Sequence, residues 1–240
     1  MSTINLLRSD ENYYGAEGKK YLSNSDIGSL LKDPFTFRKD KPKTVPMVEG
    51  SYFHTALLEP EKLVNFQFVD ASTRSTNKYK EASGGDILLL ESERAELDRM
   101  VDTIQGNIEF FDMVYAEGAK FEEPAIGEIK STMWKGKADV LTADYIVDLK
   151  TTSNIDDFKW SARKYNYDSQ AWIYNQLFGV PLVFIVIEKK TCRTGLFECS
   201  EAFLDAGREK VYKAIEVYNK FVAPRATEKL SQYFIQETLN

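Results

Sequence analysis

The segment that most constrains the fold is a strand-like run near the middle of the chain, Ile146-Val147-Asp148-Leu149-Lys150-Thr151. Its apolar, β-branched residues predict a β-strand. Successive side chains of a strand alternate between its faces, so Asp148 and Lys150 point the same way. One interpretation is an ordinary surface salt bridge beside a strand. Because unpaired charges are costly in a run of this buried type, the segment favours a site that uses both charges.

The remaining patterns predict a mixed sheet flanked by helices. Residues 120–150 read as three strands in a meander, with turns near Lys135-Gly136 and near Thr142-Ala143-Asp144. The continuous apolar run 182–187 predicts a buried central strand, and 194–199 predicts another. Helices are expected from the caps at 23–26 to Pro34, and at 48–58, 92–115, 156–178 and 200–222, with a mobile loop at 71–86 and a short helix in the tail at 226–240.

The order of these elements indicates an α/β fold organised as one domain. Within residues 1–240 we expect a helical N-terminal part at 1–118, a catalytic sheet with its helices at 119–223 and a C-terminal tail at 224–240.

A second acid lies nine residues upstream of Asp148, in Gly136-Lys137-Ala138-Asp139-Val140. If the meander is right, Asp139 and Asp148 lie at neighbouring strand ends. Two carboxylates that share a site repel each other unless a cation lies between them. Mg²⁺ prefers oxygen ligands, and a metal-activated water can attack a phosphodiester while Lys150 orients it or neutralises the developing charge. The pattern predicts a metal-dependent DNA nuclease.

Other polar residues leave alternatives open. His54 is the single histidine and lies among apolar residues, where it is either a core side chain or completes a metal site. Glu122 and Glu123 lie on the first meander strand, and either could reach the metal or Lys150 or face solvent. Gln170 and Tyr174 are four residues apart and share a helix face, which either packs in the core or meets substrate.

The net charge of −6 argues mildly against a nucleic-acid binder, but phosphate contacts depend on local basic surface. Basic residues gather at 38–43, at 74–80 and at 159–164, and each group could equally be a solvated surface.

Cys192 and Cys199 are too few for a disulfide framework or a four-thiolate site. No apolar stretch reaches the length of a membrane span, and the first residues do not resemble a secretion signal, so a cytoplasmic location is expected.

Several ordered motifs together resemble the PD-(D/E)XK nuclease superfamily in its RecB-like branch, most of all the RecE (exodeoxyribonuclease VIII) type of phage and prophage origin. They are Leu22-Ser23-Asn24-Ser25-Asp26 with Pro34, His54-Thr55-Ala56-Leu57-Leu58, the segments around Asp139 and Asp148, and Tyr165 to Tyr174. The chain departs from the superfamily pattern at Ala138, where the name of the superfamily has a proline.

The resemblance implies a restriction-endonuclease-like core and assigns roles to single residues. Metal ligands would be His54, Asp139, Asp148 and the Leu149 carbonyl. Lys150 would be the catalytic lysine and Glu123 the supporting acid, with Glu122 as its competitor. DNA contacts are expected from Gln170, Tyr174, Ser25 and Arg163.

The resemblance also implies an activity and partners. The activity would be Mg²⁺-dependent, with Mn²⁺ as a substitute, and would digest linear double-stranded DNA 5′→3′, leaving 3′ overhangs for recombination by strand annealing. The enzyme would form a ring-shaped homo-oligomer at DNA ends and work with a single-strand annealing protein of the RecT/Bet type in the host cytoplasm. Two other interpretations remain, a structure-specific endonuclease on the same core and a non-catalytic DNA-binding or assembly module.

Overall fold

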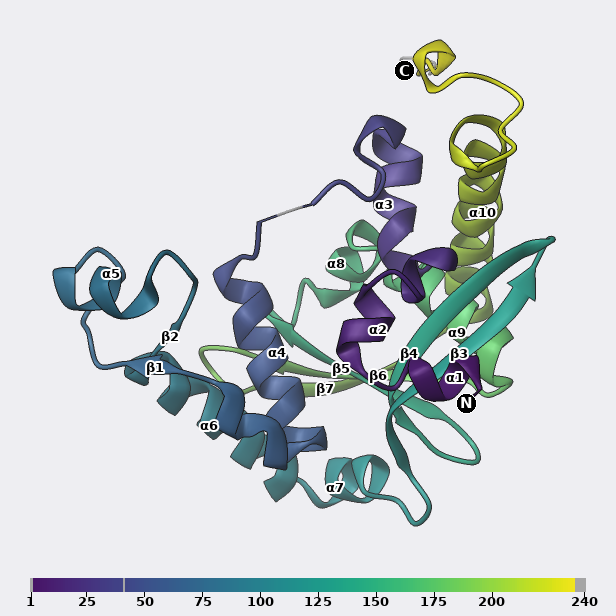
Figure 1. Ribbon diagram of the computed structural model, residues 1–240. Coiled ribbons are helices and arrows are strands. Elements are labelled where there is room, and N and C mark those ends of the chain that lie inside the picture. The colour runs from purple at the N-terminus through teal and green to yellow at the C-terminus, as the bar shows by residue number, and fades with distance from the viewer. Residues whose placement is uncertain (1, 41, 236–240) are drawn as a thin grey trace.

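A five-stranded mixed sheet forms the centre of the computed structural model, which describes residues 2–40 and 42–235. Its strand order is β3-β4-β5-β6-β7, where β3 is Lys120–Ile129, β4 Thr132–Leu141, β5 Ile146–Thr152, β6 Leu182–Glu188 and β7 Thr194–Glu198. Strands β5 and β6 are parallel, and the other neighbours are antiparallel. The predicted mixed sheet is confirmed, and Figure 1 shows it in the middle of the molecule.

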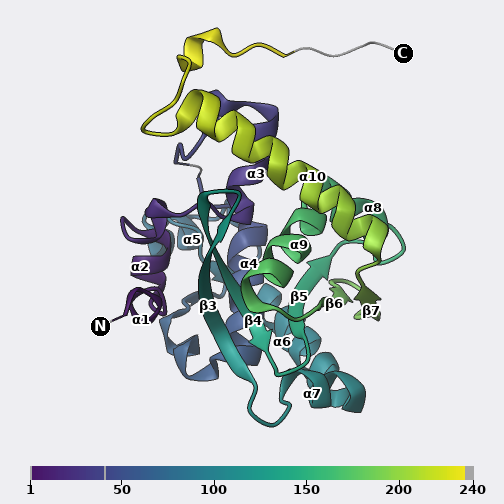
Figure 2. The same ribbon diagram turned by 90° about the vertical axis from the view of Figure 1, so that its right-hand side faces the viewer.

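Helices cover both faces of the sheet (Figure 2). One face packs against α3 (Asn24–Lys32), α8 (Phe158–Lys164), α9 (Tyr167–Phe178) and α10 (Glu201–Val217). The other packs against α4 (Val45–Leu58), α6 (Glu91–Gly106) and α7 (Ile108–Val114). In β6, Phe184 and Val186 enter the first core, whereas Ile185 and Ile187 enter the second. Burial on both faces explains why this strand is a continuous apolar run.

The N-terminal arm, residues 2–22, lies against the β3–β4 hairpin. It contains α1 (Thr3–Leu6), α2 (Asp10–Tyr14) and the 3₁₀ turn η1 (Gly18–Lys20). Its last residue joins β4 through two backbone hydrogen bonds: the Leu22 N–H donates to the Met133 carbonyl at 2.9 Å, and the Lys135 N–H donates to the Leu22 carbonyl at 2.8 Å. The arm is therefore attached to the strand that carries Asp139.

A small lobe projects beside α6 (Figure 1). It is built from the parallel pair β1 (Phe68–Val69) and β2 (Leu89–Leu90) with α5 (Asn77–Ser83). The prediction of a loop at 71–86 is wrong over α5. Thr76 caps this helix by accepting a hydrogen bond from the Tyr79 N–H at 3.2 Å, and the buried Tyr79 ring packs with Val69 and Leu90.

Two helices expected to be continuous are each divided in two. The helix predicted at 92–115 breaks at Asn107, whose side chain caps α7 by accepting from the Phe110 N–H at 3.2 Å. The helix predicted at 156–178 breaks at Asn166, which has a left-handed φ of 61°. Asparagine is typical of both positions, because its short side chain caps helices and tolerates the left-handed region.

The first expected turn of the meander is also wrong. Strand β4 runs through Lys135 and Gly136, and the chain reverses instead at Lys130 and Ser131, with φ values of 47° and 58°. Positive φ at both central residues is the geometry of the two-residue hairpin turn that suits twisted strands. The second turn is confirmed, with Thr142 Oγ1 accepting from the Tyr145 N–H at 3.0 Å.

Short segments complete the chain: η2 (Pro34–Thr36), η3 (Pro60–Asn65), the π-helical η4 (Tyr218–Val222) and η5 (Leu230–Gln232). The turn η5 lies in the tail where a short helix is expected, and residues 236–240 of that tail lie outside the described part. Across residues 2–40 and 42–235, no helix has the length and apolar character needed to cross a membrane.

Candidate active site

Asp139 and Asp148 meet where strands β4 and β5 separate. The pairs Val140–Val147 and Leu141–Ile146 join the two strands, and the same register places Asp139 opposite Asp148 one step further on. Instead of a backbone pair, Asp139 Oδ2 accepts a hydrogen bond from the Leu149 N–H at 2.8 Å. The Asp139 carboxylate thus occupies the fork between the strands, and both aspartates are buried there.

Asp148 is held by partners on β5 and α9. Its side chain is 1% exposed and forms an ion pair with Lys150 Nζ on the same strand face, as alternation predicts. Gln170 Nε2 donates to Asp148 Oδ1 at 2.5 Å. The Lys150 ammonium also lies 4.7 Å from the ring centroid of Tyr167. Lys150 is therefore fixed by a carboxylate and an aromatic face at the bottom of the site.

A second group of potential ligands surrounds Asp139. His54 on α4 brings Nδ1 to 3.3 Å from Asp139 Oδ2. The carboxylate of Glu122 completes a set in which the three candidate ligand atoms, one from each residue, all lie within 4.8 Å of one another. One nitrogen and two carboxylate oxygens form a donor set that suits a divalent cation.

Glu122, rather than Glu123, faces this group, so of the two candidates for the supporting acid we favour Glu122. In the β3–β4 register Phe121 pairs with Val140 and Glu123 with Ala138, so Glu122 lies opposite Asp139. Glu122 has a left-handed φ of 48°. Glu123 points to the N-terminal arm and forms a two-armed ion pair with Arg8, with both N–O distances at 2.7 Å.

The charges around Asp139 favour an ionised carboxylate. Burial alone would raise its pKa, but protonated His54, Lys150 and the Leu149 N–H together lower it. Burial likewise disfavours the imidazolium of His54, yet the Asp139 carboxylate outweighs this and raises the pKa of His54 to about 9. Without a metal, a proton on His54 therefore compensates the Asp139 charge.

The other two acids hold protons more readily. Burial and the nearby Asp139 charge raise the pKa of Asp148 to about 6, against the opposing effect of Lys150. Burial and Asp139 also raise the pKa of Glu122 to about 7. Burial opposes the charge on Lys150, but Asp148 and Asp139 outweigh it and raise its pKa. Lys150 therefore stays cationic at neutral pH.

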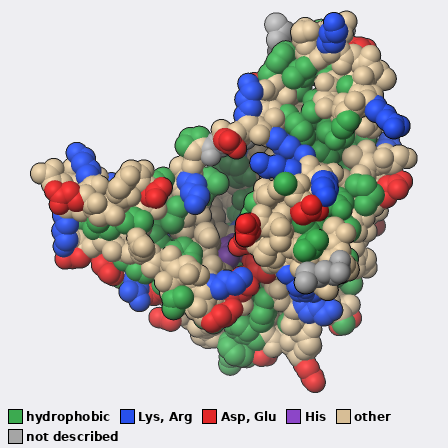
Figure 3. Space-filling view, in the orientation of Figure 1, with side chains coloured by type: hydrophobic (Ala, Val, Ile, Leu, Met, Phe, Trp, Pro, Cys, Tyr) green, Lys and Arg blue, Asp and Glu red, His purple; other side chains and the backbone are tan. Residues whose placement is uncertain are grey.

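These groups line an open cleft of about 460 Å³ that also contains Lys137, Gln170 and Tyr174. Figure 3 shows a hollow at the centre of the molecule with the single histidine at its edge. The Tyr174 hydroxyl donates to the Lys137 carbonyl at 2.9 Å. A Cβ on Gly136 would lie 2.9 Å from the Tyr174 ring, so glycine lets the ring pack against β4.

The two other predicted DNA contacts lie in different places. Ser25 borders a hollow that shares Gln170 and Tyr174 with the cleft, so it is adjacent to the site. Arg163 borders a separate cavity of about 180 Å³, outside the cleft, and its guanidinium lies 5.6 Å from the Phe203 ring centroid, so its DNA contact stays a prediction.

The predicted ligand set is brought together only in part. His54 and Asp139 lie in the cluster, Glu122 joins them, and Asp148 instead contacts Lys150 and Gln170. The Leu149 carbonyl stays a prediction. Sequence reasoning also missed Lys137, whose ammonium lies 3.7 Å from Glu122 and forms an ion pair with Asp10. Alternation along β4 was the available signal, because Lys137 shares the face of Asp139.

The sheet topology and the positions of Asp139, Asp148 and Lys150 define a PD-(D/E)XK-like fold. The chain belongs to the family described as "PDDEXK-like domain of unknown function (DUF3799)", whose model matches residues 35–231. A search of curated proteins finds no significant match.

Two solved structures are similar to the chain. A crystal structure named "Putative exonuclease" from Eubacterium rectale has a TM-score of 0.67 and 18% identity, over 97% of this chain and 96% of that one. At this identity the likeness shows a shared fold. A phage related exonuclease from Haemophilus somnus 129PT has a TM-score of 0.37 and 13% identity, over 82% of this chain and 93% of that one, which is too low to carry an argument.

Proposed function

We propose that this chain is a metal-dependent deoxyribonuclease that digests linear double-stranded DNA from its 5′ ends and leaves 3′ single-stranded overhangs. The observation that carries the proposal is the group His54, Glu122 and Asp139 beside an ion-paired Lys150 in one open cleft. A surface salt bridge would need neither this convergence nor the burial of both aspartates.

The donor set fits a divalent cation, and we propose Mg²⁺, with Mn²⁺ as a substitute. His54, Glu122 and Asp139 would hold it, and the predicted contributions of Asp148 and the Leu149 carbonyl would complete the site. A cation bound there supplies Lewis-acid activation of water and of the phosphodiester. Asp139 is ready to bind a cation, because its neighbours keep it ionised. His54, in contrast, must release a proton before it can become a ligand.

Lys150 would act directly on the substrate. Its ammonium remains protonated and is fixed by Asp148, so it can neutralise charge that develops on the phosphate oxygens without rearranging. Gln170 would hold Asp148, and therefore Lys150, in position through its hydrogen bond. Tyr174 would support the β4 backbone that carries Asp139.

The proposed biological role is recombination by strand annealing. A net charge of −6 is unfavourable for DNA binding, and a ring-shaped homo-oligomer with basic residues facing the DNA and an acidic outer surface would reconcile the two. A single-strand annealing protein of the RecT/Bet type would then receive the 3′ overhang.

End-labelled linear duplex and closed circular duplex of the same sequence test this proposal. With Mg²⁺, we expect mononucleotides released from the 5′ ends of the linear DNA and an intact circle. EDTA should stop the reaction. Nicking of the circle would replace the exonuclease by an endonuclease, and release from 3′ ends would reverse the proposed polarity. No cleavage of either DNA with Mg²⁺ or Mn²⁺ would overturn the nuclease assignment.

A further inference from the structure

Tyr14, at the end of the N-terminal arm's helix α2, is a large aromatic residue left open to solvent beside the catalytic cleft. Its side chain is 66% exposed. It borders the cleft itself and also three neighbouring hollows. Tyr14 therefore lies where paths into the cleft meet, in a part of the chain that precedes the matched family region at 35–231.

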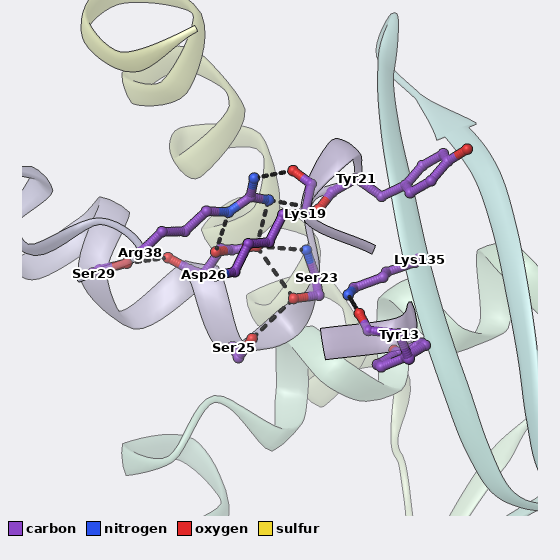
Figure 4. A network of polar contacts seen from close by, with 9 residues as sticks. All are labelled: Tyr13, Lys19, Tyr21, Ser23, Ser25, Asp26, Ser29, Arg38 and Lys135. Carbon is purple, nitrogen blue, oxygen red and sulfur yellow. Dashed lines mark hydrogen bonds and ion pairs between the residues drawn. The ribbon is translucent and has the colours of Figure 1, made fainter. Parts of the chain in front are cut away.

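The support beneath Tyr14 is rigid and buried. The ring of Tyr13, itself 6% exposed, meets the Tyr14 ring edge-to-face, with centroids 5.1 Å apart and an interplanar angle of 80°. The ammonium of Lys135 donates to the Tyr13 carbonyl and lies 4.0 Å from the Tyr13 ring centroid (Figure 4). Lys137 contacts the same ring at 4.7 Å.

Packing of the backbone also fixes the arm. A Cβ on Gly18 would lie 1.7 Å from the Tyr13 carbonyl oxygen, so the turn after α2 folds directly onto Tyr13. Ion pairs from Arg8 to Glu123 and from Asp10 to Lys137 attach the arm to β3 and β4. The backbone that carries Tyr14 is thus attached to the sheet, and the Tyr13 ring supports one edge of the Tyr14 ring, which lowers the entropic cost of stacking against it.

The charges around Tyr14 indicate which kind of ligand its ring could meet. On one side lies the cleft, where Lys137 pairs with Asp10 and Glu122 and Lys150 pairs with Asp148, so the divalent cation proposed above would supply the additional positive charge for a phosphate. On another lies a hollow bordered by Lys19, Lys39 and Lys43, whose wall is fixed by the Asp26–Arg38 ion pair shown in Figure 4. A nucleic-acid strand that places phosphates along the lysines of this hollow, and its end at the metal proposed for the cleft, would carry its bases past the exposed Tyr14 ring. Aromatic rings bind unpaired bases of any sequence by stacking.

We propose that Tyr14 is a positioning residue that stacks on an unpaired base of the DNA strand entering the cleft, and thereby sets the strand end against Lys150. This inference rests on the proposed nuclease function. It adds a specific contact, with a nucleobase rather than a phosphate, from a segment outside the matched family region.

Steady-state cleavage of linear duplex tests it, with wild type, Tyr14→Ala, Tyr14→Phe and Trp160→Ala compared. Trp160 is the matched control, because it is also 66% exposed but does not border the cleft. We expect Tyr14→Ala to raise KM by roughly 5- to 100-fold, the range found when stacking aromatics are truncated. Tyr14→Phe keeps the ring and should keep KM, and Trp160→Ala should match wild type.

A second readout separates stacking from a structural role. DNA carrying 5-iodouracil near its 5′ end, bound with Ca²⁺ to prevent cleavage, should photo-cross-link to the peptide containing Tyr14. The cross-link should persist in Tyr14→Phe and vanish in Tyr14→Ala. Suppose that wild type cleaves DNA, but that Tyr14→Ala has an unchanged KM or that Tyr14→Phe is as impaired as Tyr14→Ala. Either result would reject the stacking role of Tyr14 and leave the proposed nuclease function intact. If wild type cleaves no DNA, the proposed function falls and this inference with it.

Discussion

The two aspartates of the site lie opposite each other on neighbouring strands, yet their surroundings give them opposite tendencies. Asp139 is surrounded by a histidine, a backbone N–H and a second acid, and its pKa is lowered. Asp148 contacts Lys150 and Gln170, and burial together with the Asp139 charge raises its pKa to about 6 although Lys150 opposes this. The comparison teaches that two acids at one strand fork can differ in charge state: Asp139 is kept ionised, as the proposed metal ligand requires, whereas Asp148 can hold a proton and is ion-paired with Lys150.

The largest effect is expected at Asp139. Asp139→Asn keeps the shape and the hydrogen bond from Leu149 but removes the charge. We expect cleavage to fall on the order of 1,000-fold, equivalent to about 4 kcal/mol of lost charge stabilisation. Isothermal titration with Mn²⁺ should show weakened binding, whereas Asp144→Asn in the exposed turn after β4 should behave as wild type. Unchanged Mn²⁺ affinity in Asp139→Asn would remove it from the ligand set.

Lys150→Ala tests the proposed role of the ion pair between Asp148 and Lys150. Loss of the fixed ammonium is expected to reduce cleavage by roughly 100- to 1,000-fold, as for other groups that stabilise developing charge. DNA binding and Mn²⁺ binding should persist, and the protein should stay folded, because Asp148 can take up a proton once its partner is removed. Gel-shift assays and thermal unfolding check these points. Retained hydrolysis in this variant would contradict the catalytic role.

Glu122 and Glu123 provide a matched pair of variants. Glu122→Gln removes a potential ligand and should lower metal affinity and cleavage by about 10- to 100-fold. Glu123→Gln removes only the ion pair with the half-exposed Arg8, which is worth about 1 kcal/mol or less. Cleavage rates and Mn²⁺ titrations of both variants decide the assignment. Equal losses, or a larger loss in Glu123→Gln, would restore Glu123 as the supporting acid.

The last prediction concerns the pH dependence of metal binding. The pKa values of His54, about 9, and Glu122, about 7, mean that both residues hold protons that a bound metal must displace. Metal affinity should therefore rise from pH 6 to pH 8, by at most about tenfold per pH unit for each proton displaced. Mn²⁺ titration calorimetry in buffers of different ionisation enthalpy should detect proton release. An affinity independent of pH would contradict the protonated state of His54.

Much of the fold was predictable because its signals are local. Apolar β-branched runs correctly predicted β5 and β6, and alternation placed Asp148 and Lys150 on one face. The helix breaks at Asn107 and Asn166 could also have been recognised, because asparagine is typical of helix ends. The hairpin at Lys130 and Ser131 did not, because neither residue is the glycine or asparagine that normally marks this turn.

That missed turn explains why the sequence left Glu122 and Glu123 as competitors for the supporting acid. The turn position sets the β3–β4 register, and a shift of one residue exchanges the faces of every side chain. Glu122 and Glu123 therefore could not be distinguished without the hairpin. His54 and the N-terminal arm reach the site by tertiary packing from distant elements, for which local patterns carry no signal. The resemblance to a family motif pointed to His54, whereas no sequence pattern pointed to Tyr14, whose role is proposed from the structure alone.

The left-handed backbone conformation of Glu122 destabilises the fold locally, and interactions elsewhere in the molecule must offset this strain. A β-strand residue with a side chain is strained at a φ of 48°, where glycine or asparagine would be more comfortable. Replacing Glu122 by glycine would then relax the backbone while it removes a carboxylate that we propose binds the metal. At this position the stability of the fold and the proposed metal binding favour different residues. A screen for stability alone would therefore select against the Glu122 carboxylate.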